Sequence, residues 1–279
     1  MSSFENVEIF EDTKNLCEKN GRIKDSLAKS VKNQKLILEG EDLPVVDKSR
    51  FTDNAKVTVS TKRTFEAASG YVGQKVAVHN FASATNPGGG VTRGSSAQEE
   101  CLCRCSTLYP CLNIEEMWKR FYGPHRAAGN PLYNDDCLYT PGVVVFKSDV
   151  SCPERMEEQD WYQVDVLTCA APNLRETMVE FVNSNTGKQF GKFERGRLYQ
   201  LFLQRIERIF RIAAANEEDV LILGAFGCGA FCNPPEMVAR AFKDVQKKYA
   251  AYFEMIEYAV FCRGDETKNH TAFCVAFEE

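Results

Sequence analysis

The sequence predicts an α/β fold, in which a mixed sheet lies between helices and a helical segment precedes it. Three observations support this prediction. From residue 56 onward, short β-branched or apolar runs alternate with stretches of helical periodicity. The run at 219–223 is almost continuously apolar, which is typical of a strand buried on both faces. Two glycine-rich stretches each follow a predicted strand directly. Ligands of α/β sheets bind at loops beyond the carboxyl ends of strands, so both stretches are candidate functional sites.

The first 50 residues follow a different pattern from the rest of the chain. Residues 11–29 read as one amphipathic helix, in which Leu16 and Ile23 are flanked by charges, and a polar, mixed stretch follows. We therefore expect a helical accessory segment over residues 1–50 and a second domain over residues 51–279.

In the second domain, strands and helices alternate. Strands are expected at residues 56–60, 75–81, 143–146, 164–168, 219–223, 258–261 and 272–277. Helices are expected at residues 65–71, 97–108, 114–122, 195–216 and 234–249. The longest of them places Leu198, Phe202 and Ile209 on one face. The helix from residue 97 is expected to end before Pro110, and the last helix begins at prolines, as helix starts often do.

Composition and charge exclude several classes of function. The chain has 279 residues, of which 44% are hydrophobic, enough for one sizeable core. It has no uninterrupted apolar run of about 18 residues, so no membrane span is expected. The first residues carry neither a basic cluster nor an apolar run, which favours a cytoplasmic location. A net charge of −5 argues against general nucleic-acid binding, although backbone amides can still hold a small anionic ligand.

The cysteine count is high, at twelve. Without a signal peptide, reduced thiols are a better interpretation than a disulfide scaffold. A zinc site at Cys101, Cys103 and Cys105, with Cys111 nearby, is the minor alternative, because this spacing lacks the paired Cys-x-x-Cys of common zinc sites. We expect these side chains to be small buried hydrophobes and expect neither a metal nor a cofactor.

The first glycine-rich stretch contains three successive glycines, Gly88, Gly89 and Gly90. Their backbone can approach a ligand closely, and the stretch matches neither Gly-x-Gly-x-x-Gly nor a Gly-Lys-Ser/Thr motif. Glu99 and Glu100 follow near the start of the next helix. Neighbours on a helix differ by about 100° in direction, so only one of them should face the loop squarely. The two acids are either helix-capping carboxylates or catalytic groups.

The second glycine-rich stretch, residues 224–235, follows the buried strand and precedes a helix. Gly227 and Gly229 allow a tight turn whose amides, together with the helix start, can cradle a diphosphate. Phe231 could stack on a ribose or adenine face. The alternative is a helix cap with two core phenylalanines, but the presence of the first stretch favours the functional interpretation.

The two stretches resemble one family. Gly88-Gly89-Gly90, seven further residues and then Gln98-Glu99-Glu100 resemble the signature of poly(ADP-ribose) glycohydrolases. Residues 80–84 (Asn-Phe-Ala-Ser-Ala) with 86–90 (Asn-Pro-Gly-Gly-Gly) resemble the bacterial-type subfamily, whose catalytic part is a macrodomain. Residues 101–109 and 170–173 match as well, and the second stretch resembles the phosphate-binding loop of the family. The resemblance covers roughly residues 55–279 and implies a macrodomain-like fold for the second domain.

The resemblance implies a role for each matching residue. Glu100 corresponds to the acid that protonates the leaving oxygen of a ribose–ribose bond and then activates water. Glu99 would bind the hydroxyls of the ribose at the cleaved bond. The residues expected to bind the substrate are Asn86, Gly88, Gly89, Gly90, Val91, Gln98, Gly227, Cys228, Gly229, Ala230 and Phe231. The family often has tryptophan where Phe226 stands and glycine where Cys232 stands.

Three functions agree with these motifs. The leading hypothesis is a hydrolase that releases ADP-ribose from poly(ADP-ribose) on modified proteins, acting as a monomer. The alternatives are a macrodomain that binds ADP-ribose without cutting it and a hydrolase of terminal mono-ADP-ribose. The pair Glu99 and Glu100 favours the first, because a binding module needs no second acid facing the anomeric carbon. Asp135 and Asp136 are interpreted as a solvated turn rather than as metal ligands.

Overall fold

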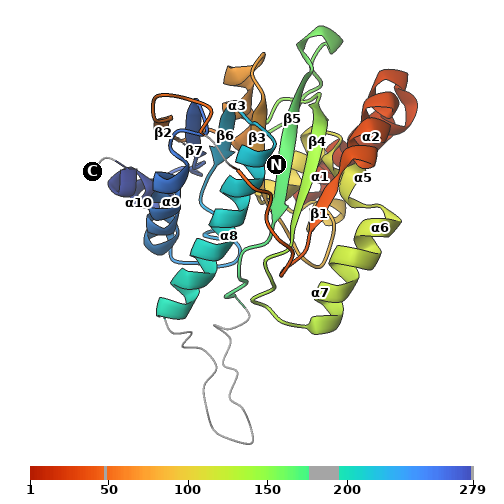
Figure 1. The fold of residues 1–279 in the computed structure, drawn as a ribbon. Helices are drawn as coiled ribbons and strands as arrows, with labels where there is room; N and C mark the ends of the chain where they lie inside the picture. The colour runs from red at the N-terminus through yellow and green to blue at the C-terminus, as the bar shows by residue number, and fades with distance from the viewer. Residues whose placement is uncertain (47–48, 176–194, 278–279) are drawn as a thin grey trace, which may run out of the picture.

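One mixed sheet forms the centre of the molecule, with helices on both faces (Figure 1). The computed structural model describes residues 1–46, 49–175 and 195–277. Within these residues the sheet has seven strands in the order β1-β4-β5-β3-β6-β7-β2. The strands are β1 (Lys35–Ile37), β2 (Lys56–Ser60), β3 (Val76–Phe81), β4 (Cys137–Val145), β5 (Tyr162–Cys169), β6 (Val220–Leu223) and β7 (Met255–Ala259). β4 runs antiparallel to both of its neighbours, and the other neighbouring pairs are parallel.

Alternate residues of the strands enter two separate cores, because successive side chains of a strand point to opposite faces. Ala77 and Leu221 pack against α8 (Arg195–Ala215) and α9 (Pro235–Tyr249). Val78 and Ile222 pack on the other face with α3 (Thr64–Ala68), α4 (Gln98–Cys105) and α5 (Leu108–Leu112). A sheet covered in this way has to be apolar on both faces, which is why β6 reads as a continuous apolar run.

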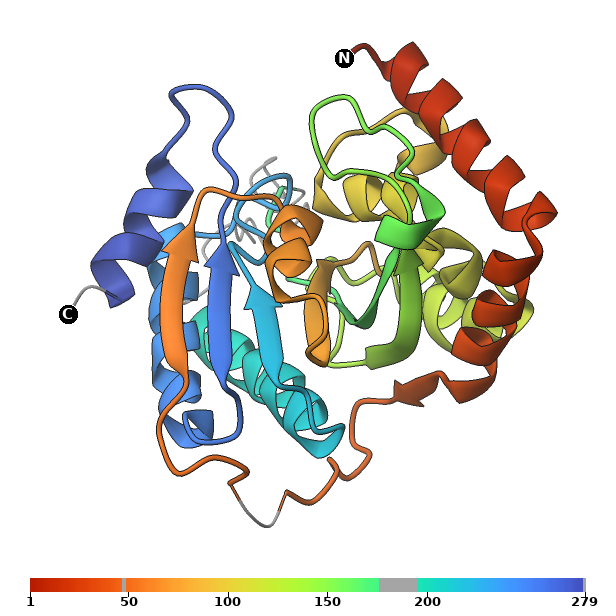
Figure 2. The ribbon, with the colours of Figure 1, turned by 90° about the horizontal axis from the view of Figure 1, so that it is seen from above.

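The N-terminal segment forms two helices and one strand. α1 (Ser3–Lys19) and α2 (Gly21–Asn33) lie along the β4 side of the sheet, away from α10 (Figures 1 and 2). The prediction of one continuous helix over 11–29 is wrong, because Asn20 is extended and its side chain caps α2 by accepting from the Ile23 amide at 3.1 Å. β1 then pairs with β4 at the sheet edge. The division of the chain at residue 50 stays a prediction.

Two further predictions are corrected by the structure. Residues 272–277, expected as a strand, belong to the helix α10 (Lys268–Phe277). Its apolar residues Phe273 and Phe277 are four positions apart, so as a helix they share one face and both contact Tyr258. The helix expected over 97–108 ends at Cys105, and Pro110 lies in the first turn of α5, where proline is tolerated.

Most other elements are confirmed. α8 and α9 match the helices predicted over 195–216 and 234–249, and β2 matches the strand at 56–60. The helix expected over 114–122 is a run of α6 (Glu115–Met117), the π-helical η3 (Trp118–Tyr122) and α7 (Gly123–Ala128). The remaining short helices are the 3-10 turns η1 (Ser69–Tyr71), η2 (Val91–Arg93) and η4 (Glu158–Asp160). Among the described residues, no helix is long and apolar enough to cross a membrane.

Candidate active site

Three neighbouring strands end at the same edge of the sheet. β5, β3 and β6 lie side by side and run parallel, so their carboxyl ends meet. β3 continues into residues 82–97, here called the first loop, and β6 continues into residues 224–234, the second loop. A Cβ built on Gly224 would lie 3.0 Å from Phe81 Cζ, so the second loop begins close to the end of β3, where the first loop also begins.

The three successive glycines of the first loop lie in tight turns. The Gly89 amide donates to the Asn86 carbonyl and the Val91 amide donates to the Gly88 carbonyl, both at 3.0 Å. Gly89 has φ +58°, and a Cβ on it would lie 2.5 Å from Glu100 Oε1. A residue with a side chain would therefore be strained and would clash with the acid. The loop thus brings bare backbone against the carboxylate.

Glu99 is buried at the start of α4 and both of its oxygens accept hydrogen bonds. The Ser83 amide donates to Oε2 at 2.7 Å, and Asn80 Nδ2 donates to Oε1 at 3.3 Å. Asn80 in turn donates to Thr168 Oγ1 at 3.2 Å, which links the carboxyl to β5. The pKa of Glu99 is raised to about 8: burial raises it most, the Ser83 hydrogen bond lowers it, and the charge of Glu100 raises it by a smaller amount. Glu99 is therefore protonated at neutral pH in the free protein.

Glu100 is held at the glycine turn by one oxygen. The Gly90 amide donates to Glu100 Oε1 at 2.8 Å, and the side chain is 7% exposed. Oε2 has no hydrogen-bond partner within the part of the chain that the structure describes. Both acids thus contact the first loop, Glu99 near its beginning and Glu100 at its glycines. Of the two acids, only Glu100 has a carboxyl oxygen without a hydrogen-bond partner among the described residues.

The other predicted residues of the first loop fall into different environments. The Asn86 side chain accepts a hydrogen bond from Arg126, whose Nε also donates to the Thr85 carbonyl at 2.6 Å. Val91 is fully buried, and its side chain packs beneath the glycine turn, since a Cβ built on Gly88 would lie 3.0 Å from Val91 Cγ1. Gln98 accepts from the Phe81 amide at 2.9 Å and thereby ties the end of β3 to the start of α4.

The second loop presents backbone donors. Among the described residues, the amides of Gly229, Ala230 and Phe231 have no hydrogen-bond acceptor. Gly229 and Ala230 are also exposed, so a ligand can reach their amides. The Cys228 amide is used within the loop, because it donates to the Ala225 carbonyl at 3.0 Å. Successive free amides next to a helix start form a site for an anion. α9 begins at Pro235, directly after these amides.

Buried side chains hold the second loop against the end of β5. Asn233 Nδ2 donates to the Pro172 carbonyl at 2.7 Å and to the Gly227 carbonyl at 3.0 Å. A Cβ on Gly227 would lie 2.4 Å from Ala171 Cβ, so this glycine permits the close approach. Phe226, at the position where the family often has tryptophan, is buried with its ring 4.5 Å from that of His79. Burial lowers the pKa of His79 to about 3, so this histidine is neutral and serves as packing.

The predictions for Asp135 and Asp136 are corrected, because neither lies in a solvated turn. Asp135 accepts a hydrogen bond at 2.8 Å from Arg205, which is fully buried. Asp136 is buried and accepts the Glu39 amide at 2.6 Å. Over the described ranges, no group of three or more histidine, cysteine or acidic side chains is arranged to hold a metal. None of the twelve cysteines, all of them among the described residues, forms a disulfide, and of the candidate zinc ligands only Cys101 is not buried.

Sequence reasoning assigned no role to several residues of the site. Asn80 and Ser83 belong to the motif that carries the family resemblance, but the contact with Glu99 joins residues 16 to 19 positions apart. Arg126 lies about 40 positions after Thr85 and Asn86, the residues of the first loop that it contacts. Its guanidinium carbon lies 4.7 Å from the centre of the Trp118 ring. No local pattern indicates such contacts.

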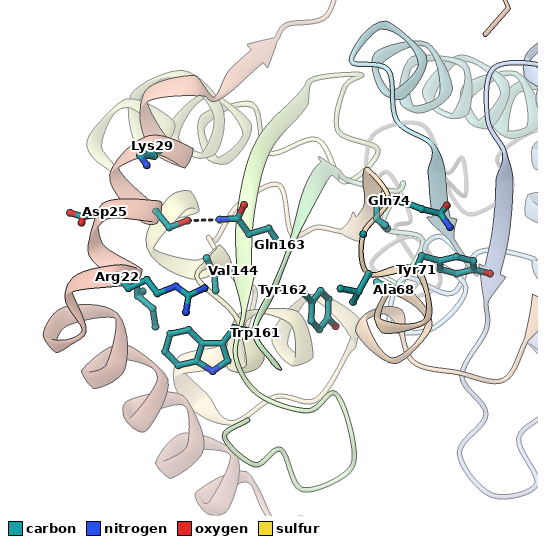
Figure 3. Close-up of a pocket in the computed structure, with 15 residues that line it drawn as sticks. Arg22, Asp25, Lys29, Ala68, Tyr71, Gln74, Val144, Trp161, Tyr162 and Gln163 are labelled. Atoms are coloured by element: carbon teal, nitrogen blue, oxygen red, sulfur yellow. Dashed lines mark hydrogen bonds between the residues drawn. The ribbon is translucent and has the colours of Figure 1, made fainter. Parts of the chain in front are cut away.

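A separate cavity of about 640 Å³ lies at the opposite edge of the sheet, between α2 and the start of β5 (Figure 3). Arg22, Trp161 and Gln163 line it, and Gln163 donates to Ser26 Oγ at 2.9 Å. It contains none of the predicted site residues. The candidate site is therefore the edge where the first and second loops meet.

Comparisons with known proteins place the chain in a family. The family described as microbial-type PARG, catalytic domain, matches residues 4–148, more than half of the chain. The X-ray structure of poly(ADP-ribose) glycohydrolase (PARG) from Thermomonospora curvata is 28% identical, with a TM-score of 0.82, over 98% of this chain and 99% of that one. The structure of the Thermomonospora curvata enzyme bound to the inhibitor ADP-HPD is 29% identical over the same shares, with a TM-score of 0.78.

A third solved structure is PARG from Deinococcus radiodurans in complex with ADP-ribose. It is 30% identical over 90% of this chain and 97% of that one, with a TM-score of 0.75. A comparison with curated proteins found no match. The chain therefore belongs to the microbial-type PARG family, with the macrodomain-like fold and the glycoside-hydrolase domain of that family.

Proposed function

We propose that this chain hydrolyses the ribose–ribose O-glycosidic bonds of poly(ADP-ribose) and releases ADP-ribose, with Glu100 as general acid and base. The observation that carries the assignment is the geometry of Glu100. One carboxyl oxygen is anchored by the Gly90 amide, and the other is available beside a turn that has no side chains. The similar enzyme from Deinococcus radiodurans binds ADP-ribose, which agrees with a diphosphate at the free amides of the second loop.

The reaction needs one carboxyl to act twice. Glu100, protonated in the complex with the anionic substrate, first donates its proton to the oxygen that leaves as the C1–O bond breaks, and the sugar becomes oxocarbenium-like. The Glu100 carboxylate then accepts a proton from water as the water oxygen bonds to C1. The products are free ADP-ribose and a polymer end with a new hydroxyl. Glu99, neutral at pH 7, is suited to hydrogen-bond ribose hydroxyls without adding a second negative charge.

The other site residues bind and orient the substrate in this proposal. The amides of Gly229, Ala230 and Phe231 hold the diphosphate, and the Phe231 ring packs on the adenosine. The glycines of the first loop let the ribose approach Glu100, and Asn86 contacts the same ribose from the edge of the loop. We expect the chain to act as a monomer, in the cytoplasm, on polymer attached to modified proteins.

The test is the release of ADP-ribose from a poly(ADP-ribosyl)ated protein. Glu100→Gln should lower kcat by about 10²- to 10⁴-fold, the usual contribution of a general acid, while ADP-ribose still binds. Glu116→Gln, at an exposed position of α6, is the matched control. A wild-type protein that binds ADP-ribose but releases none would be a binding module. Equal release by Glu100→Gln would show that the acid is assigned to the wrong residue. A substrate carrying single ADP-ribose units, assayed in parallel, separates polymer cleavage from removal of the terminal unit.

A further inference from the structure

The buried face of α1 lies against the first loop and against α4. Its buried residues are Asn6, Phe10, Thr13 and Cys17, spaced as one helical face. Phe10 packs edge-on against Tyr109 of α5 with ring centres 4.8 Å apart. The other face is charged and exposed. An accessory helix of this kind would stabilise the fold in general, but two of its contacts also hold the first loop, one directly and one through α4.

The first contact joins α1 to Gly94 in the first loop. Asn6 Nδ2 donates to the Gly94 carbonyl at 2.9 Å, and Asn6 is only 3% exposed. A Cβ on Gly94, which has φ +76°, would lie 2.0 Å from the Ser3 carbonyl oxygen. The backbones of the helix and the loop therefore touch, and a side chain at residue 94 would force them apart.

The second contact joins α1 to the C-terminal half of α4. Thr13 Oγ1 donates to the Arg104 carbonyl, and Arg104 Nη1 donates to the Ser95 carbonyl at 2.6 Å. Lys147, buried beneath α1, donates to Thr13 Oγ1 at 2.8 Å and pairs with Asp12 at the same distance. A buried ammonium needs such partners, so it holds this turn of α1 in one place.

Both contacts lead to the catalytic carboxyl. The Ser95 amide donates to the Gly90 carbonyl at 3.2 Å, and the Gly90 amide donates to Glu100 Oε1 at 2.8 Å. Gly90 is thus fixed from both sides, by Ser95 and by Glu100. Ser95 is fixed in turn by Gly94 before it in the chain and by Arg104, and α1 holds both of these residues.

We propose that α1 is a working part of the active site and that Asn6 is a positioning residue for Glu100. Its hydrogen bond sets the place of Gly94 and, through Ser95, the place of the Gly90 amide that orients the acid. The positioning of the first loop by α1 is independent of the proposed function, and only the expected effect on kcat rests on that function. Misplacement of a catalytic group by about 1 Å can lower the rate on the order of 10²-fold, so a change in a helix that does not touch the substrate can still lower kcat.

The test compares two identical substitutions in the N-terminal segment. Asn6→Ala removes the contact with the loop, and Asn20→Ala removes a helix cap whose side chain, among the described residues, hydrogen-bonds only with the Ile23 amide and Glu158. We expect Asn6→Ala to lower kcat by about 10- to 100-fold with KM and ADP-ribose affinity within about threefold, because Asn6 supports the part of the first loop that orients Glu100 and not Asn86 or the amides of the second loop. Asn20→Ala should leave both constants near the wild-type values. Thr13→Val, which breaks the second contact, should lower kcat in the same direction.

Hydrogen exchange of the ligand-free protein separates this inference from the proposed function. The Gly90 and Ser95 amides should exchange faster in Asn6→Ala than in Asn20→Ala at matched urea stability. If wild-type protein releases no ADP-ribose, the proposed function fails, and the exchange result still decides whether α1 positions the loop. Equal loop exchange in the two variants, or equal kcat at matched stability, would overturn the role of Asn6. If Asn6→Ala does not fold, the same comparison is made with Thr13→Val.

Discussion

The buried carboxyl of Glu99 should make the stability of the protein fall as pH rises. Its pKa is about 8 in the folded chain against an ordinary value of 4.5, so the folded state binds the proton more tightly. The stability linked to this proton is fully present below about pH 4.5 and is lost as pH rises through about 8. At about 1.4 kcal/mol for each unit of pKa, the contribution of Glu99 to the free energy of unfolding should fall by roughly 3–4 kcal/mol between pH 5 and pH 9. Glu99→Gln, which resembles the protonated acid, should remove this loss.

The assay is urea unfolding of wild type and Glu99→Gln at pH 5, 7 and 9. The variant should be about as stable as wild type at pH 5 and more stable at pH 9, because glutamine carries no charge to bury. Glu154→Gln, at an exposed position, is the control for a general effect of removing one acid. If the difference between Glu99→Gln and wild type is the same at all three pH values, burial does not raise the pKa of Glu99. The neutral Glu99 in the proposed mechanism would then have to be abandoned.

Other substitutions test the two loops and their support. Gly89→Ala should abolish hydrolysis, because φ is +58° and the new Cβ would lie 2.5 Å from Glu100 Oε1; steady-state kinetics at matched protein stability check this. Gly227→Ala should weaken ADP-ribose binding, measured by calorimetry, because its Cβ would meet Ala171 at 2.4 Å and displace the second loop. Arg126→Ala should raise the Kd for ADP-ribose by releasing the first loop, and Arg126→Lys should not restore it, since an ammonium lacks the two-pronged geometry. Unchanged affinities in the last two variants would show that these contacts do not shape the binding site.

The sequence was informative where a local pattern has one physical solution. The apolar run of β6 has to be buried on both faces, and the periodicity over 195–216 has to form a long helix, and both are present. It was misleading where one pattern has two solutions. The apolar residues of 272–277 suit a strand or one face of a helix, and the contacts of Phe273 and Phe277 with Tyr258 select the helix. The continuous helix over 11–29 was broken by a cap at Asn20 that only a hydrogen-bonding geometry reveals.

By itself, then, the sequence determined the alternation of strands and helices, the two glycine loops at strand ends, and the presence of two adjacent acids behind the first of them. These features depend on residue type and spacing along the chain, which is what local conformational preference and burial act on. The tertiary structure alone decided how the two acids differ. Glu99 is enclosed by Asn80 and Ser83 and holds its proton, whereas Glu100 is anchored at one oxygen only. It also decided that α1 holds the first loop, through a hydrogen bond from Asn6 to Gly94, which lies 88 positions later in the sequence. Contacts between distant segments and the burial of a charge are properties of the packed chain, because no stretch of sequence contains both partners.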